Sequence, residues 1–169
     1  MSRQTRTCNK DASLDETLEL YRQARRELQG AEQEIERARG EGGPIPEAIT
    51  HQLEALQTSI AEQRNALTRR LNDRLRTTLT GGRVVMTAGV QGRGESFLAR
   101  ALAAVRAFDA FDADDDPYGE HDFGALEIEE ARLFWKIDAY DPRGEYGSED
   151  PADPAMTLRV LTLMLAEEY

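Results

Sequence analysis

Apolar residues recur at helical spacing along the first part of the chain. The larger side chains repeat every seven residues, at Leu14, Tyr21, Leu28 and Ile35. Smaller ones follow three positions later, at Thr17, Ala24, Ala31 and Ala38. This pattern is typical of a coiled-coil seam, and its small residues let a partner helix approach closely. Ser13 and Glu16 have the spacing of a capping box, which predicts that the helix begins there.

A second long helix is predicted after a break. The segment 40–46 holds three Gly and two Pro, which a helix does not tolerate. One apolar stripe then follows helical spacing, formed by Ile49, Leu53, Leu56, Ile60, Leu67, Leu71, Leu75 and Leu79. The short connection makes the two helices antiparallel neighbours. Residues 13–79 therefore predict a coiled-coil-like helical hairpin after a disordered tail at 1–12, and the long seam favours a homodimer through this hairpin.

The pattern changes to shorter segments after Gly82. Residues 83–90 (RVVMTAGV) are bounded by glycines and predict a strand, and residues 95–108 carry apolar side chains at helical spacing. Residues 123–128 and 133–140 are then two alternating segments on either side of four polar or small residues. They predict an antiparallel hairpin, in which Trp135 is a core residue.

The last element predicted is a helix. Asp153 supplies an N-cap, Pro154 fits the first helical position, and residues 155–167 are rich in Leu and Met. The predicted fold class is therefore α+β. It consists of an N-terminal antiparallel helical hairpin plus a small β-α-β-β-α domain over residues 80–169, with an antiparallel hairpin in its sheet.

Charge separates the two parts of the chain. Residues 1–78 hold 13 Lys/Arg and 13 Asp/Glu, while residues 79–169 hold 8 and 19, so the net charge of −11 arises entirely in the second part. A field of this sign repels nucleic acid and membrane surfaces and attracts a basic protein partner. No apolar run is long enough to span a membrane, and the start lacks the apolar segment of a signal peptide, so we expect a cytoplasmic protein.

Four blocks of the second part carry a resemblance. They are residues 80–90 (TGGRVVMTAGV), 116–124 (DPYGEHDFG), 134–138 (FWKID) and the C-terminal run 150–169. Together they resemble a bacterial domain-of-unknown-function family of small cytosolic proteins, often met on plasmids and integrative elements. Residues 91–96 depart from the family's usual pattern, and the helical hairpin looks like an addition to it. The resemblance implies a mobile-element setting and assigns no catalytic residue.

The candidate interaction surface is an acidic loop. Its members are Asp109, Asp112, Asp114, Asp115, Asp116, Glu120 and Asp122. The segment from Asp112 to Asp116 has the one-three-five spacing of a calcium loop, but Pro117 and Phe123 stand where such a loop needs Gly and Glu. We therefore expect a solvated acidic surface that binds a basic protein, and no cofactor or metal.

The alternative is a divalent-metal-dependent hydrolase or nuclease-like enzyme. It would use Glu120, His121, Asp122 and Asp138 as ligands or acid/base groups. Lys136 shares a strand face with Asp138, although an exposed face of a hairpin often carries such a pair. His51 is the one other histidine, and Cys8 the single cysteine, so a zinc set cannot be assembled. His121 is expected to order its loop through hydrogen bonds.

Overall fold

The fold was analysed in a computed structural model that describes residues 13–40, 42, 45 and 47–169. The chain divides after Ala61 into two compact units. The predicted disordered tail and Cys8 lie outside the described residues. Among those described, no helix is both long enough and apolar enough to cross a membrane.

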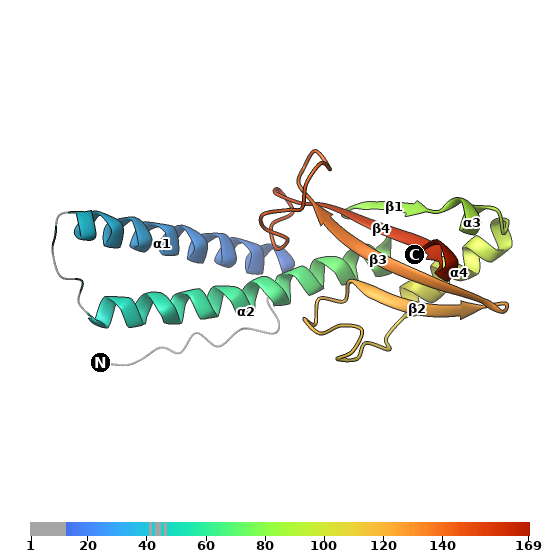
Figure 1. The fold of residues 1–169 in the computed structure, drawn as a ribbon, viewed down its shortest axis with the longest axis horizontal. Coiled ribbons are helices and arrows are strands. Elements are labelled where there is room, and N and C mark those ends of the chain that lie inside the picture. Colours follow the sequence, from blue (N-terminus) through green and yellow to red (C-terminus); the bar gives the residue numbers. More distant parts are fainter. Residues whose placement is uncertain (1–12, 41, 43–44, 46) are drawn as a thin grey trace. The chain divides into compact units, whose positions relative to one another are not determined.

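The first unit contains helix α1 and the first part of helix α2. Helix α1 (Leu14–Gly40) begins with the predicted capping box, because the Ser13 amide donates to Glu16 Oε2 over 2.9 Å and the Glu16 amide donates to Ser13 Oγ over 3.2 Å. Helix α2 (Glu47–Thr78) starts in this unit and runs antiparallel to α1 (Figure 1). Gln57 Nε2 donates to Glu32 Oε1 across the pair over 3.1 Å. The predicted helical hairpin is confirmed.

Burial follows the two predicted stripes along the helices. On α1 the buried apolar residues are Leu18, Tyr21, Ala24 and Ile35, and on α2 they are Ile60, Leu67, Leu71 and Leu75. Ile49, at the start of the second stripe, is exposed. Tyr21, Ala24 and Ile35 belong to the predicted seam of α1, but Leu18 does not, and Leu14 and Leu28 of that seam are only half-buried.

The second unit is built on a mixed four-stranded sheet in the order β1-β4-β3-β2. Its strands are β1 (Arg83–Met86), β2 (Phe123–Ile128), β3 (Ala131–Tyr140) and β4 (Leu158–Leu165). β1 pairs with β4 in parallel, and the other two pairs are antiparallel. Helices α3 (Ala88–Gln91) and α4 (Glu95–Ala107) connect β1 to β2, and a short 3-10 helix η1 (Ala166–Glu168) follows β4 (Figure 1). The predicted α+β class is confirmed.

The core lies between α4, the end of α2 and one face of the sheet. Phe97, Ala101 and Val105 of α4 and Leu75 of α2 join alternate residues of the central strands. Those strand residues are Leu133, Trp135, Ile137, Leu161, Leu163 and Leu165. Trp135 is fully buried, as predicted. Gly124 makes room for it, because a Cβ at that position would lie 2.6 Å from Trp135 Nε1.

The predicted closing helix over residues 155–167 is wrong, because this segment forms strand β4. The Asp153 side chain does accept the Ala155 amide, over 2.9 Å, but the turn does not continue into a helix. β4 lies between β1 and β3, so both of its edges are paired, and it carries apolar residues on the core face and also on the opposite face. Such a Leu-rich run cannot be told from a buried helix by periodicity alone.

The predicted strand over residues 83–90 is also shorter than expected. β1 ends at Met86, and α3 starts at Ala88. The Glu168 carboxylate receives the Gly89 amide over 2.9 Å and the Thr87 hydroxyl over 2.5 Å. These contacts turn the chain away from the sheet, and a Cβ on Gly89 would lie 2.7 Å from that carboxylate.

The β2–β3 hairpin is confirmed, with a tighter turn than predicted. Ile128 pairs with Ala131, so Glu129 and Glu130 alone make the turn. Their φ angles of 50° and 66° are both positive, as a type I′ turn requires. Asn or Gly is usual there because a Cβ makes this conformation unfavourable.

We predict that Glu130→Gly stabilises the protein by about 1 kcal/mol, since it removes the Cβ from a left-handed position. Chemical denaturation of the variant and wild type would measure the gain. Glu130→Ala is the matched control, because it removes the same charge but keeps the Cβ. If both variants gain equally, relief of charge crowding and not of backbone strain is responsible.

Candidate functional site

The acidic loop between α4 and β2 is folded by its own aspartates. Asp112 Oδ1 accepts the amides of Asp114 and Asp115 over 2.9 and 3.0 Å. The Asp116 amide in turn donates to the Asp112 carbonyl over 2.8 Å. The Asp112 side chain therefore stabilises a local turn of the type that Asp side chains favour. Three other acidic residues of this part of the loop are exposed, namely Asp109, Asp114 and Asp115.

Asp116 is an internal anchor, with only 8% of its surface exposed. Its Oδ1 accepts the Glu120 amide over 2.8 Å and the His121 amide over 3.2 Å. A buried carboxylate is tolerated where it receives such hydrogen bonds. Asp116 thus closes the second half of the loop and does not contribute to an exposed surface.

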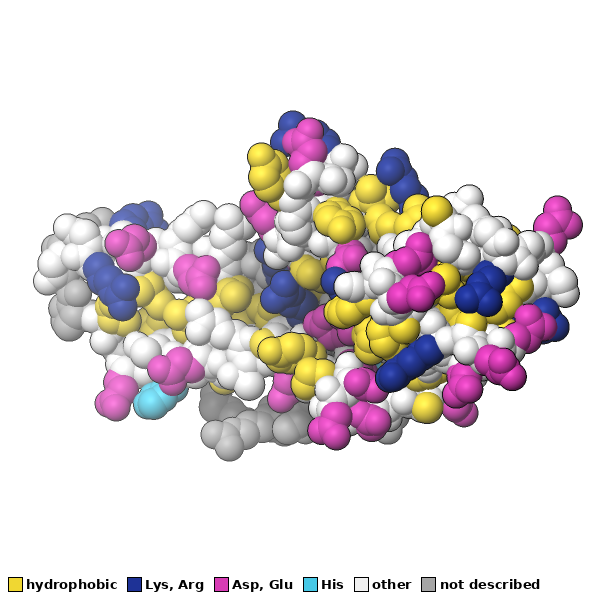
Figure 2. All heavy atoms as spheres, turned by 45° about the vertical axis from the view of Figure 1, so that its right-hand side comes forward, with side chains coloured by type: hydrophobic (Ala, Val, Ile, Leu, Met, Phe, Trp, Pro, Cys, Tyr) yellow, Lys and Arg dark blue, Asp and Glu magenta, His cyan; other side chains and the backbone are white. Residues whose placement is uncertain are grey.

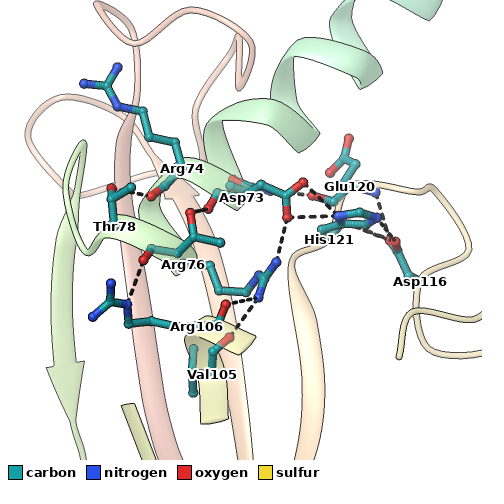
Figure 3. Close-up of polar contacts among 11 residues, drawn as sticks. Asp73, Arg74, Arg76, Thr78, Val105, Arg106, Asp116, Glu120 and His121 are labelled. Atoms are coloured by element: carbon teal, nitrogen blue, oxygen red, sulfur yellow. Dashed lines mark hydrogen bonds and ion pairs between the residues drawn. The ribbon is translucent and has the colours of Figure 1, made fainter. Parts of the chain in front are cut away.

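His121 ties the loop to helix α2. Its ring stacks on Phe111, with centroids 3.7 Å apart and planes 4° from parallel. Nδ1 lies 3.0 Å from both oxygens of Asp73, and Nε2 lies 3.8 Å from Asp116 Oδ2 (Figure 3). Because an ionised carboxylate only accepts, Nδ1 must be the protonated nitrogen of this contact. The predicted loop-ordering role fits these contacts.

Asp73 also receives the buried side chain of Arg76. Arg76 Nη2 lies 3.1 Å from Asp73 Oδ1, while Nη1 donates to the carbonyls of Val105 and Arg106 over 2.8 and 3.2 Å (Figure 3). Those carbonyls belong to the last turn of α4, where few backbone amides are available, although the Val105 carbonyl also accepts the Phe108 amide over 3.3 Å. Arg76 therefore caps α4 and connects it to α2.

Asn72 makes a second bridge from α2. Its Nδ2 donates to the Glu120 carbonyl over 2.9 Å, and its Oδ1 accepts Arg159 Nε over 3.0 Å. Arg159 is almost fully buried on the core side of β4 and also donates to the Pro151 carbonyl. Burial lowers the pKa of Arg159 to about 10, while Glu120 and Asp150 oppose this shift. The charged form persists at neutral pH.

Glu120 and Asp122 are the half-buried acids of the loop. Burial raises the pKa of the Glu120 carboxyl, and nearby Asp122 raises it further. Burial also raises the pKa of Asp122, an effect that a hydrogen bond to its own backbone opposes. Asp138 lies close enough to add to the shift of Asp122 and forms an ion pair with Lys136 over 2.7 Å.

The structure sorts the predicted site residues into three sets. Asp109, Asp114 and Asp115 are exposed, Asp112 and Asp116 are used inside the loop, and Glu120, Asp122 and Asp138 are partly buried. Across the described part of the chain, no group of three or more His, Cys, Asp or Glu residues is arranged to hold a metal ion. The His121 ring is directed to Asp73 and Phe111, away from a shared site with Asp138.

Several residues of this network were not predicted. They are Asn72, Asp73, Phe111 and Arg159. It was also not predicted that Arg76 is buried while the nearby Arg69, Arg70 and Arg74 are exposed. One signal was present in the sequence. Arg159 interrupts an apolar run, and a charged residue in such a run needs a buried partner.

Residues 86–168, just under half of the chain, match the model of a family described as "Protein of unknown function (DUF3768)". The matched segment begins within β1 and ends within η1, so it includes the acidic loop and most of the sheet. Neither the curated proteins nor the solved structures contain a match.

We predict that Asp116→Ala lowers the free energy of unfolding by about 1–3 kcal/mol, because two partly buried amides lose their acceptor. Urea denaturation would measure the loss. Asp115→Ala is the matched control, since Asp115 is exposed and its change should stay within about 0.5 kcal/mol. Equal effects of the two changes would show that the Asp116 contacts do not stabilise the loop.

We predict that Asp122→Asn raises the melting temperature at pH 7. The pKa of Asp122 is raised on folding from its ordinary 3.8, so its stabilising contribution is complete below that pH and is lost as pH rises through the folded-state pKa. The advantage of the variant should therefore shrink as pH falls towards 4. Thermal melts across this range would measure it.

Asp141→Asn provides a control of opposite sign. Hydrogen bonds from the Glu145 and Tyr146 amides lower the pKa of Asp141, so its contribution is present at neutral pH and is lost on acidification. This variant should melt below the wild type at pH 7, with a difference that also shrinks in acid. The same sign for both variants would contradict the assigned shifts.

Proposed function

We propose that this protein is a non-enzymatic interaction module whose acidic loop binds a basic surface of a protein partner. One observation carries the proposal: Asp109, Asp114 and Asp115 are exposed on a loop that other residues hold in place. None of the ion pairs found among the described residues involves these three side chains.

A fixed cluster of exposed charge suits electrostatic steering. Complementary charges raise the rate of encounter between proteins, and they act through the local field and not through average composition. A loop already held by Asp112, Asp116 and His121 loses little further conformational freedom when it binds. The conformational entropy that the cluster loses on binding is therefore small.

The resemblance to proteins of plasmids and integrative elements suggests a setting for this module. A basic partner in that setting would be a DNA-binding or defence protein of the bacterial cytoplasm. The module would then act as an accessory or anti-defence protein that presents carboxylates where DNA presents phosphates. A homodimer formed through the helical hairpin would present two such loops to the same partner.

The test uses the variant Asp109→Asn/Asp114→Asn/Asp115→Asn. A partner is first isolated with the wild-type protein from a bacterial lysate, and its association rate is then measured against both proteins over a range of salt concentrations. Removal of three exposed charges should slow association roughly tenfold at low salt and have little effect near 1 M salt.

The matched control carries Glu34→Gln, Glu54→Gln and Glu62→Gln, which remove the same net charge from exposed sites elsewhere. Its association rate should stay close to that of the wild type. An unchanged rate for the loop variant, or an equal loss for the control, would show that the loop is not the binding surface.

The alternative is a divalent-metal-dependent hydrolase that would use Glu120, His121, Asp122 and Asp138. These residues would have to move together, because the described residues contain no group arranged to hold a metal ion. The observation that favours it is the raised pKa of Glu120 and Asp122. Burial is its main cause, and a bound cation would offset the cost of ionising these carboxylates. Thermal melts with millimolar Mg²⁺ or Mn²⁺ distinguish the two functions. A ligand at 100 times its dissociation constant stabilises by about 2.7 kcal/mol, and a shift of that size would favour the enzyme.

A further inference from the structure

One face of the sheet has no covering α-helix within the described part of the second unit. The core side is filled by α4 and the end of α2. Strand alternation and register place Val85, Phe123, Phe134, Val160, Thr162 and Met164 on the opposite face. Val85 is 41% exposed, and most of the others are only half-buried. A sheet that offers apolar residues on both faces normally packs against a layer on each.

An aromatic cluster lies on the β2–β3 side of this face. Phe123 and Phe134 have ring centroids 5.5 Å apart, and Tyr169 lies 6.1 and 5.5 Å from them. Arg132 stands 5.3 Å above the Phe134 ring. Tyr169 nevertheless remains 72% exposed. Large aromatic side chains that are only partly covered are typical of binding hot spots.

Negative charge surrounds the cluster. On the face itself Lys136 pairs with Asp138 and Arg132 stands opposite Glu127, while Arg83, paired with Val160, adds one exposed positive charge at the start of β1. Beyond the ends of the strands lie Asp122 and Asp141 on one side and Glu130 and Glu167 on the other. Figure 2 shows apolar side chains of this part of the molecule interspersed with and bordered by acidic ones.

We propose that this open face binds a cationic amphipathic helix of a partner protein. The apolar side of the helix would cover Val85, Phe134 and Tyr169, and its basic residues would reach the carboxylates around the strand ends. A ten-residue strand such as β3 is roughly 33 Å long, close to the roughly 27 Å of an 18-residue helix. This inference rests on the proposed function, because it names the structural class of the basic partner.

Charge argues against two other occupants. A second copy of this face would bring together two domains that each carry 8 Lys/Arg and 19 Asp/Glu after residue 78, and like charge opposes such pairing. Single-stranded nucleic acid also stacks on aromatic residues of sheets, but it needs a positively charged groove along its backbone. The acidic border of this face lacks that property.

The probe is a synthetic peptide of about 18 leucine and lysine residues, ordered so that the leucines form one helical face. The control peptide has the same composition in a shuffled order without an apolar face. Fluorescence anisotropy of each labelled peptide with the full-length protein gives the two dissociation constants. We expect the amphipathic peptide to bind roughly tenfold more tightly.

Two protein variants locate the binding site. Val85→Ser/Tyr169→Ala changes exposed side chains of the open face and should weaken binding of the amphipathic peptide at least about tenfold. Met156→Ser is the matched control, because Met156 is 42% exposed, almost the same as Val85, but lies outside the strands. Melting temperatures close to wild type would show that all variants are folded.

The outcomes separate this inference from the proposed function. Equal binding of both peptides, weakened only by neutralising Asp109, Asp114 and Asp115, would overturn the open-face site and leave the acidic loop as the binding surface. Failure of both peptides to bind would overturn both. A dimer that the Val85→Ser/Tyr169→Ala variant disrupts, or competition by a single-stranded oligonucleotide, would overturn the helix as the occupant.

Discussion

The contact of the Asp73 carboxylate with Arg76 and His121 is the constraint on which the second unit depends. Arg76 is buried, and a buried guanidinium without a counter-charge is strongly destabilising. Asp73 supplies that charge and at the same time forms a hydrogen bond with His121 Nδ1. Through these two partners, one helical carboxylate holds the end of α4 and the acidic loop against α2.

Aromatic rings complete this polar junction. Arg76 Nε has no hydrogen-bond partner among the described residues, but the guanidinium lies 5.3 Å from the Phe111 ring centroid and 5.8 Å from that of Trp135. Cation–π attraction is strongest where the cation is desolvated, as here. Phe111 stacks on His121 and also contacts the buried ring of Trp135. Ring packing and hydrogen bonding therefore hold the His121 side chain in the same position.

Local sequence patterns predicted most of the helices and the β2–β3 hairpin. The elements and site residues that were not predicted depend on contacts between residues far apart in the sequence. Seven-residue periodicity and the Ser13 cap belong to single helices, so they can be recognised without knowledge of the fold. Strand β4 is different, because its apolar run resembles that of a buried helix and only its pairing with β1 and β3 identifies it as a strand. Asn72 and Asp73 look like ordinary polar residues of a helix, and only folding brings them to Glu120 and His121.

The carboxylates of the second part of the chain fall into two groups, according to whether or not they accept hydrogen bonds from backbone amides. Asp112, Asp116, Asp141 and Glu168 accept backbone amides, so their charge helps to fix turns and loop ends. Backbone hydrogen bonds accordingly lower the pKa of Asp141, and the Thr87 hydroxyl together with backbone amides lowers that of Glu168.

The remaining loop acids have no comparable role in stability. Burial raises the pKa of Glu120 and Asp122, so ionisation at these positions opposes folding. Asp109, Asp114 and Asp115 are exposed, and like charges that stand close together repel one another without a compensating contact. The fold holds this exposed cluster in place although the cluster does not stabilise the fold, which supports our proposal that the loop binds a positively charged partner.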